Sequence, residues 1–171
     1  MDENYTMIKK WLLFLDSHVE DDVMKCFGSQ LDFLRVWLWP NATDEGMNND
    51  KDETLCLNNL YRVFNLRTAL KIAYVIGVHI QADIWISQAS RSSEVINNKL
   101  FNKKSYTYSD GSMANLAVAL LAEVVPAQDS VKVLESLERE ILVKFKGYIH
   151  AGITGGALLF RLLRGARPGI T

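Results

Sequence analysis

The sequence predicts an all-α fold, a single-domain bundle of about six or seven helices with a buried central helix. Apolar residues recur at helical spacing over long stretches, and capping residues and prolines delimit those stretches. One apolar run could form a strand, but no second segment of equal quality exists to pair with it. With 171 residues, 49% of them hydrophobic, the chain can bury a core. We therefore expect one helical domain over residues 1–171.

The first amphipathic helix is predicted over residues 8–26, where apolar side chains follow the i, i+3, i+4, i+7 pattern of one helical face. Gly28 suits its end, and a second helix over residues 30–39 is closed by Pro40. That second helix carries three large aromatic side chains, Phe33, Trp37 and Trp39. They lie either in the core or in an exposed patch that binds a partner.

Residues 41–53 are acidic and rich in Asn and predict a mobile loop. Helical spacing resumes at Leu57, and residues 66–85 predict the central helix, because the chain is apolar nearly all round over residues 69–80. The β-branched residues of that run also permit a strand, but its flanks favour helix. The serine-rich residues 87–94 predict a break.

The second half of the chain predicts two further helices before its glycine-rich end. Residues 102–111 read as a loop, and residues 113–125 form an almost uncharged, and therefore buried, helix that Pro126 ends. Residues 130–149 predict an amphipathic helix, with Glu140 and Lys144 paired at i, i+4 on its polar face.

The stretch HAGITGGALLF, residues 150–160, could be a phosphate cradle, an interfacial membrane segment or a corner between helices. It lacks the Lys and the Ser or Thr of a nucleotide-binding loop, and no strand precedes it. We expect a corner followed by a helix over residues 157–164. That helix would place Arg161, Arg164 and Arg167 together on the outside.

The charge is uneven along the chain. Residues 1–60 carry a net charge of −7 and the remainder +6, and no acidic residue follows Glu140. This polarity predicts a basic C-terminal surface able to contact phosphates. Its candidate residues are Lys144, Lys146, Arg161, Arg164 and Arg167, with Lys103, Lys104, Tyr106 and Tyr108 as a second basic and aromatic group.

No local motif indicates catalysis, a metal or a cofactor. The histidines and the two cysteines lack the spacing of a zinc site, and no serine or histidine lies in a triad-like setting. We therefore expect free thiols, no bound metal, no cofactor and no enzyme activity. No run is long enough to span a membrane, and the N-terminus does not resemble a secretory signal, so we expect an intracellular, cytoplasmic protein.

Two segments resemble the paired BH1 and BH2 regions of Bcl-2 proteins: SDGSMANLAVALLAEVV, residues 109–125, and YIHAGITGGALLFRLL, residues 148–163. The Asp-Gly precedes a buried helix and the Gly-Gly opens a later short one. The resemblance covers about a third of the chain and departs from the family at the Asn-Trp-Gly-Arg core of BH1. It implies a groove that receives an amphipathic helix.

We therefore predict a non-enzymatic helical assembly or binding protein that forms a homo-oligomer and binds RNA or another anionic partner through its basic end. The chain is also similar in composition to small viral helical proteins of the capsid or accessory type. The alternatives are a Bcl-2-like groove module, with Phe33, Trp37 and Trp39 as partner-binding residues, and an enzyme whose site is assembled from distant segments.

Overall fold

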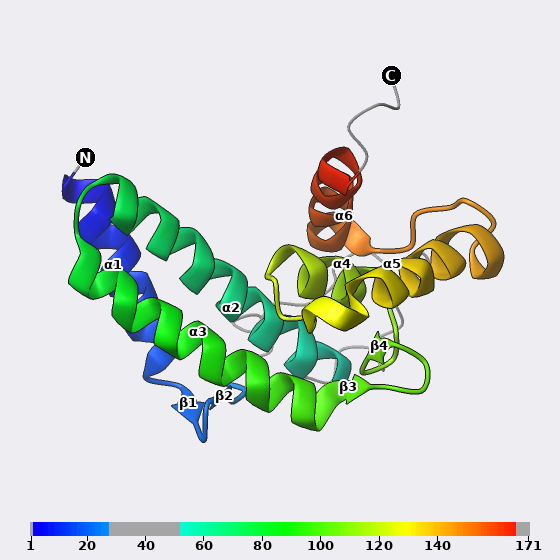
Figure 1. Cartoon of the computed structure of the whole chain (residues 1–171), viewed down its shortest axis with the longest axis horizontal. Coiled ribbons are helices and arrows are strands. Elements are labelled where there is room, and N and C mark those ends of the chain that lie inside the picture. Colours follow the sequence, from blue (N-terminus) through cyan, green and yellow to red (C-terminus); the bar gives the residue numbers. More distant parts are fainter. Residues whose placement is uncertain (1, 28–51, 167–171) are drawn as a thin grey trace.

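The computed structural model describes residues 2–27 and 52–166 (Figure 1). Over these residues the chain is mostly helical, which confirms the all-α expectation at that level. The helices are α1 (Asp2–Asp16), α2 (Asp52–Val75), α3 (His79–Leu100), α4 (Met113–Leu121), α5 (Ser130–Arg139) and α6 (Gly152–Ala166). A 3-10 turn, Ala127–Asp129, precedes α5, and a π-helical segment, Glu140–Lys144, follows it.

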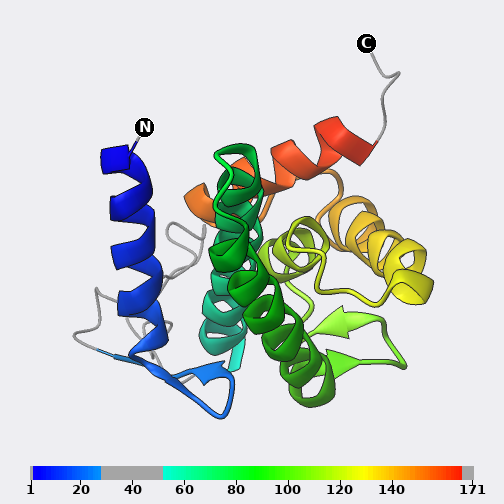
Figure 2. The same cartoon turned by 60° about the vertical axis from the view of Figure 1, so that its left-hand side comes forward.

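The core is centred on α4, which packs against α2, α5 and α6. Its residues from Met113 to Ala119 are all buried, as their lack of charge predicts. The α2–α3 hairpin is the most extensive helix pair, and α1 lies along its outer side (Figure 2). Helix α6 packs against α4 (Figure 2), and its Arg161 lies over Phe64 of α2.

The predicted central helix over residues 66–85 is wrong, because the chain reverses within it. Gly77, at φ +79°, ends α2 in a Schellman motif: the Val78 N–H donates to Ala73 O at 2.8 Å, and the Gly77 N–H donates to Tyr74 O at 3.1 Å. Helix α3 then begins at His79. The apolar run is thus the tip of a hairpin, where Val75 is 86% exposed.

The predicted break at residues 87–94 is also wrong, since α3 continues through it. The Ser87 hydroxyl donates to Asp83 O and the Ser93 hydroxyl to Ala89 O, each one helical turn back. Serine in this arrangement is compatible with a helix interior, because its hydroxyl bonds to a carbonyl of its own helix.

Two short antiparallel hairpins were not predicted. In the first, β1 (Val19–Glu20) pairs with β2 (Val23–Met24) through a turn at Asp21 and Asp22, both of which have positive φ. Aspartate tolerates this conformation. Helix α1 ends at Asp16, ten residues before the predicted limit at residue 26, and the hairpin follows it. The side chain of Asn59 fixes β2 to α2, since Asn59 Oδ1 accepts from Met24 N at 2.7 Å and Asn59 Nδ2 donates to Met24 O at 3.0 Å.

The second hairpin pairs β3 (Phe101–Asn102) with β4 (Thr107–Tyr108), and all of it except Phe101 falls in the predicted loop over residues 102–111. Ser112 then caps α4 by accepting from the Asn115 N–H. The predicted helix over residues 130–149 is shorter, because α5 gives way to the π-helical segment at Glu140. The cysteines form no disulfide: Cys56 is buried, and Cys26 is exposed.

The glycine-rich stretch forms the first half of α6, so the helix begins earlier than the predicted residue 157. Gly155 faces α4, where a Cβ on Gly155 would lie 2.7 Å from the Cβ of Ala114. Glycine there permits the close approach of α4 and α6. The second Gly of the pair, Gly156, has no atom within 4 Å of a Cβ position.

Some predictions lie outside the described residues. The aromatic helix over residues 30–39, with Phe33, Trp37 and Trp39, belongs to the range 28–51. Most of the predicted loop over residues 41–53 does as well, although its last two residues, Asp52 and Glu53, are the first two of α2.

Replacing Gly155 by Ala should destabilise the protein by about 1–3 kcal/mol, because the added methyl overlaps Ala114. The matched control is Gly156→Ala in the same helix. It should leave the stability unchanged or raise it by up to about 1 kcal/mol, since Ala favours helix over Gly. Urea unfolding midpoints at unchanged slope provide the measurement. Equal effects of the two substitutions would contradict the close helix contact.

Candidate functional site: a cationic groove between α2 and α6

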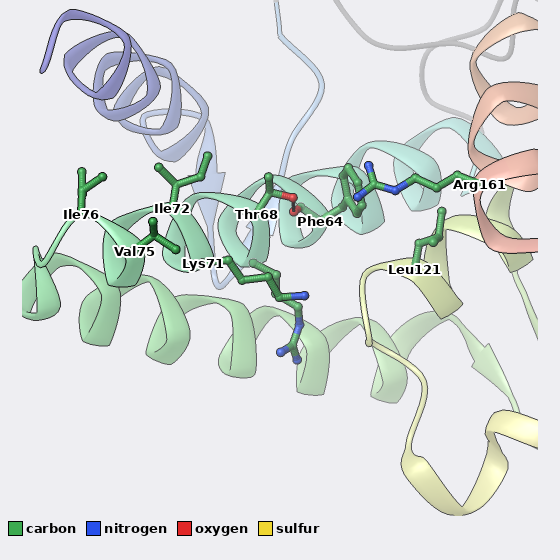
Figure 3. Close-up of a pocket in the computed structure, with 9 residues that line it drawn as sticks. Phe64, Thr68, Lys71, Ile72, Val75, Ile76, Leu121 and Arg161 are labelled. Carbon is green, nitrogen blue, oxygen red and sulfur yellow. Dashed lines mark hydrogen bonds between the residues drawn. The ribbon is translucent and has the colours of Figure 1, made fainter. Parts of the chain in front are cut away.

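A groove lies between the C-terminal half of α2, the end of α4 and the middle of α6, with a volume of about 540 Å³ (Figure 3). Its apolar lining consists of Phe64, Ile72, Val75, Ile76 and Leu121. Its polar lining consists of Arg67, Thr68, Lys71 and Arg161. Its volume falls within the range of small-molecule sites, roughly 300–1,000 Å³, but the groove is about half open to solvent, whereas such sites enclose most of their ligand.

Helix α2 supplies most of the lining from a single face. Phe64, Thr68, Lys71, Ile72 and Val75 recur at intervals of three or four residues, so that they lie along one side of the helix. The orientation of α2 therefore determines which side chains line the groove.

Two of the cations share one carboxylate. Arg67 Nη1 donates to Glu123 Oε2 at 3.3 Å, and Arg67 Nη2 donates to the backbone oxygen of Glu123 at 3.1 Å. Lys71 Nζ donates to Glu123 Oε1 at 3.1 Å. Glu123 follows α4 with φ +53°, a conformation that Gly or Asn adopts more readily than Glu. Its side chain holds both cations at the groove.

The third cation approaches from the opposite side. The guanidinium carbon of Arg161 on α6 lies 5.3 Å from the ring centroid of Phe64, as a cation–π contact, and Figure 3 shows the side chain reaching across to that ring. No carboxylate pairs with Arg161 among residues 2–27 and 52–166. Among the described residues, three cations line the groove, and one carboxylate, that of Glu123, contacts two of them.

A partly buried ion pair fixes α2 from its other side. Arg62, 3% exposed, donates from Nη2 to Asp16 Oδ1 on α1 at 2.6 Å and from Nη1 to the Ser92 hydroxyl on α3 at 2.7 Å. Gln88 Nε2 donates to the second Asp16 oxygen at 2.9 Å. This network joins α1, α2 and α3 through charge-assisted hydrogen bonds.

The structure places the predicted basic C-terminal residues in different surroundings. Lys144 pairs with Glu140 at i, i+4 in the π-helical segment, as predicted, and Lys146 follows with φ +52°. Arg161 and Arg164 are both exposed on α6, but of the two only Arg161 lines the groove. Arg167 lies outside the described residues.

The second predicted group is held by structural contacts. Lys103 pairs with Asp129, and Tyr106 accepts a 2.8 Å hydrogen bond from Lys132 Nζ. Lys104 is exposed in the β3–β4 turn. Tyr108 is fully buried and donates to Asn97 Oδ1 at 2.6 Å, so its ring has no face to stack on a base.

Sequence reasoning missed the groove residues on α2. Phe64, Arg67, Thr68 and Lys71 recur at helical spacing, and this signal could have marked a mixed cationic and apolar face. The partners Glu123 and Arg161 are distant in sequence, and no local pattern connects them to α2.

Within the part of the chain that the structure describes, no group of three or more His, Cys, Asp or Glu side chains could hold a metal ion. In the same residues no helix combines the length and the apolar character needed to cross a bilayer.

Comparison with known proteins identifies relatives. Residues 1–168 match the family model described as bacterial alpha-L-rhamnosidase 6 hairpin glycosidase domain. An alpha-L-rhamnosidase from Dictyoglumus thermophilum superposes with a TM-score of 0.78 and 20% identity, over 96% of this chain and 18% of that one. A native alfa-L-rhamnosidase from Aspergillus terreus gives the same TM-score and coverage at 18% identity. No curated protein matches the sequence.

These matches correct the function predicted from the sequence. The match to a glycosidase family over residues 1–168 contradicts the predicted function as a non-enzymatic, self-assembling, RNA-binding or viral protein. It also contradicts the alternative of a Bcl-2-like groove module. The expectation that the chain is not an enzyme is wrong for the same reason. The uneven charge along the sequence led to the wrong prediction, because the net charge of a segment does not show which cations are paired with a carboxylate. Lys103 and Lys144 are both paired in this way.

Replacing Arg62 by Leu should destabilise the protein by about 3 kcal/mol, because it leaves the Asp16 carboxylate without its buried partner. The matched control is Arg91→Leu on α3. The Arg91 side chain is 62% exposed, and its Nε lies 3.5 Å from Asp22 Oδ1. The loss of Arg91 should therefore change the free energy of unfolding by less than about 1 kcal/mol. Chemical denaturation of both variants tests the difference, and equal losses would contradict a structural role for Arg62.

Alkaline pH should destabilise the fold through Tyr108. Burial raises the pKa of Tyr108 above its ordinary value of 10.0, so the folded state favours the neutral phenol. This stabilisation is complete below about pH 10 and is lost as the pH rises further. Tyr108→Phe should lower stability at neutral pH by about 1 kcal/mol and flatten the decline in stability above about pH 10. The control Tyr148→Phe, at a 77% exposed tyrosine, should keep the wild-type dependence.

Proposed function

Because the chain belongs to the family of bacterial alpha-L-rhamnosidase 6 hairpin glycosidase domains, we propose that it supplies helical scaffold and binding surface to a glycoside hydrolase that cleaves α-L-rhamnosidic bonds. The observation that carries this proposal is the match of the family model to residues 1–168. The two structural relatives support it through the fold, over 96% of this chain. The chain spans 18% of the length of each relative, so activity and substrate belong to the proposal.

The helical hairpin is the building unit in this proposal. The reversal at residues 76–78 joins α2 and α3 into one antiparallel hairpin, and α4 and α5 follow each other through a short connection. Six hairpins would contain twelve helices, and the described residues contain six α-helices. The single domain predicted over residues 1–171 stays a prediction, and the predicted central helix over residues 66–85 is replaced by the buried helix α4. A homo-oligomer and an intracellular location also stay predictions.

Glycoside hydrolysis ordinarily needs two carboxyl groups, one as general acid and one as nucleophile or general base. Among the described residues, three carboxylates that are less than one quarter exposed are bound to cations: Asp16 to Arg62, Asp129 to Lys103, and Glu140 to Lys144. Their side chains are 24%, 5% and 15% exposed, respectively. These pairs have structural roles, so we assign the catalytic carboxyl groups elsewhere.

The proposed activity can be measured with a chromogenic aryl α-L-rhamnoside. The protein should release the aryl group and free L-rhamnose, while the matching aryl β-D-glucoside should not react. The rate should follow a bell-shaped pH profile, because one carboxyl group must be protonated and the other ionised. The anomer formed first, followed by NMR, reports retention or inversion.

Absence of L-rhamnose release, together with absence of L-rhamnose binding by calorimetry, would overturn the proposed function. Folding of the sample is established independently by far-UV circular dichroism, since the described chain is mostly helical.

A further inference from the structure

We infer that two copies of this chain form a pair in which α1 of each copy packs antiparallel against α6 of the other. The family match and the two relatives concern glycoside hydrolysis and say nothing of association between copies, so the inference goes beyond the proposed function. It gives the homo-oligomer expected from the sequence a defined interface. That interface consists of the exposed faces of two helices, α1 and α6.

Helix α1 has an exposed stripe of large apolar side chains. Met7, Trp11 and Phe14 recur at intervals of four and three residues, so they share one side of the helix. All three are exposed, Trp11 by 49%, and Trp11 stacks on Phe14 with the ring centroids 5.8 Å apart. A different side of α1, with Leu12 and Leu15, packs in the core. Methionine and aromatic residues that are exposed together in this way are typical of a protein interface.

Helix α6 has a stripe with the same spacing. Ile153, Ala157 and Phe160 recur at intervals of four and three residues, and all three are exposed, Phe160 by 60%. The stripe lies on the opposite side of the helix from Gly155, which faces α4. Packing of α6 in the core therefore leaves this face open for a partner.

The two stripes are complementary in size when the helices run antiparallel. Residues at intervals of four and three form the seam along which two helices pack. Setting Trp11 opposite Ala157 places the largest side chain of one stripe against the smallest of the other. To within one residue, the same register also pairs the flanking positions, Met7 with Phe160 and Phe14 with Ile153.

Charge selects the antiparallel direction over the parallel one, which would bring the same two stripes together. The first turn of α1 contains Asp2 and Glu3 in the sequence, whereas α6 contains no acidic residue and has Arg164 in its last turn. Antiparallel packing brings the acidic start of α1 to the basic end of α6, and it also aligns the two helix dipoles favourably. Parallel packing would bring His18 to Arg164 and gain no opposite charge.

The two stripes of one copy cannot meet each other, because α1 lies beside the α2–α3 hairpin and α6 lies well away from α1 in both views (Figures 1 and 2). A contact between two different surfaces closes in a pair when each copy contributes both of them. Two copies of the described residues contain twelve α-helices, which is the number that six helical hairpins contain. We therefore expect a closed pair and not a longer series of copies.

Sedimentation equilibrium of the full chain tests the inference. Over about a hundredfold range of protein concentration, the mass should rise from that of one chain to that of two and no further. Far-UV circular dichroism of the wild type and of every variant establishes folding, because the described chain is mostly helical.

Two truncations and a control locate the interface. Trp11→Ala and Phe160→Ala should each weaken association by about 10-fold or more, because large aromatic side chains contribute most of the binding energy of an interface. Leu142→Ala should not change it, since Leu142 is exposed to a similar degree but lies in the π-helical segment, outside both stripes. If Trp11→Ala does not fold, Phe160→Ala decides.

A charge reversal tests the direction of packing. Arg164→Glu should weaken association by about 3-fold, and Glu3→Arg added to it should restore the wild-type affinity. A merely structural effect of Arg164→Glu would not be reversed by a change on α1.

The inference is overturned if the folded chain stays a monomer at the highest concentration or if its mass rises beyond two copies. It is also overturned if Leu142→Ala weakens association as much as Phe160→Ala, or if the double charge variant associates as weakly as Arg164→Glu. Release of L-rhamnose by a chain that stays a monomer would contradict the inference alone. A pair that neither releases nor binds L-rhamnose would contradict the proposed function alone.

Discussion

One buried guanidinium orients the helices on which the groove depends. Arg62 extends from α2 to Asp16 on α1 and Ser92 on α3, and it is almost inaccessible to solvent. The donors of a guanidinium point in fixed directions, so satisfying both partners restricts the rotation of α2 about its axis. The groove residues Phe64 and Lys71 lie on that same helix. A contact inside the hairpin therefore sets which face α2 presents toward α6.

The other wall of the groove is fixed by polar anchors to α3. Asn97 donates from Nδ2 to Val124 O at 2.9 Å and accepts from the Tyr108 hydroxyl at 2.6 Å. These contacts hold the chain directly after Glu123, whose carboxylate lies between Arg67 and Lys71. Because Gly155 lets α6 approach α4 closely, Arg161 reaches Phe64. The groove is thus assembled from packing contacts that lie outside it.

Much of the helical content could be predicted from the sequence, because apolar periodicity and lack of charge are local signals. The buried α4 follows from its uncharged sequence, and Leu57 and Leu60 are buried on α2 as their spacing predicts. The errors in the predicted helices arose where one local sequence pattern is compatible with two structures. An apolar run became a hairpin tip at Gly77, and a serine-rich stretch stayed helical because Ser93 bonds to its own helix. For the candidate site, only the residues on α2 had a local signal.

The sequence by itself determined the helical class, the burial of α4 and the presence of many cations in the second half of the chain, because periodicity and composition depend on neighbouring residues alone. Only the tertiary structure decided which cations are paired and which converge. Lys103 is bound to Asp129, and Arg161 lies over Phe64, 97 positions away in the sequence. Coulombic and stacking energies depend on distances in space, and those distances are set by helix packing that no local pattern encodes.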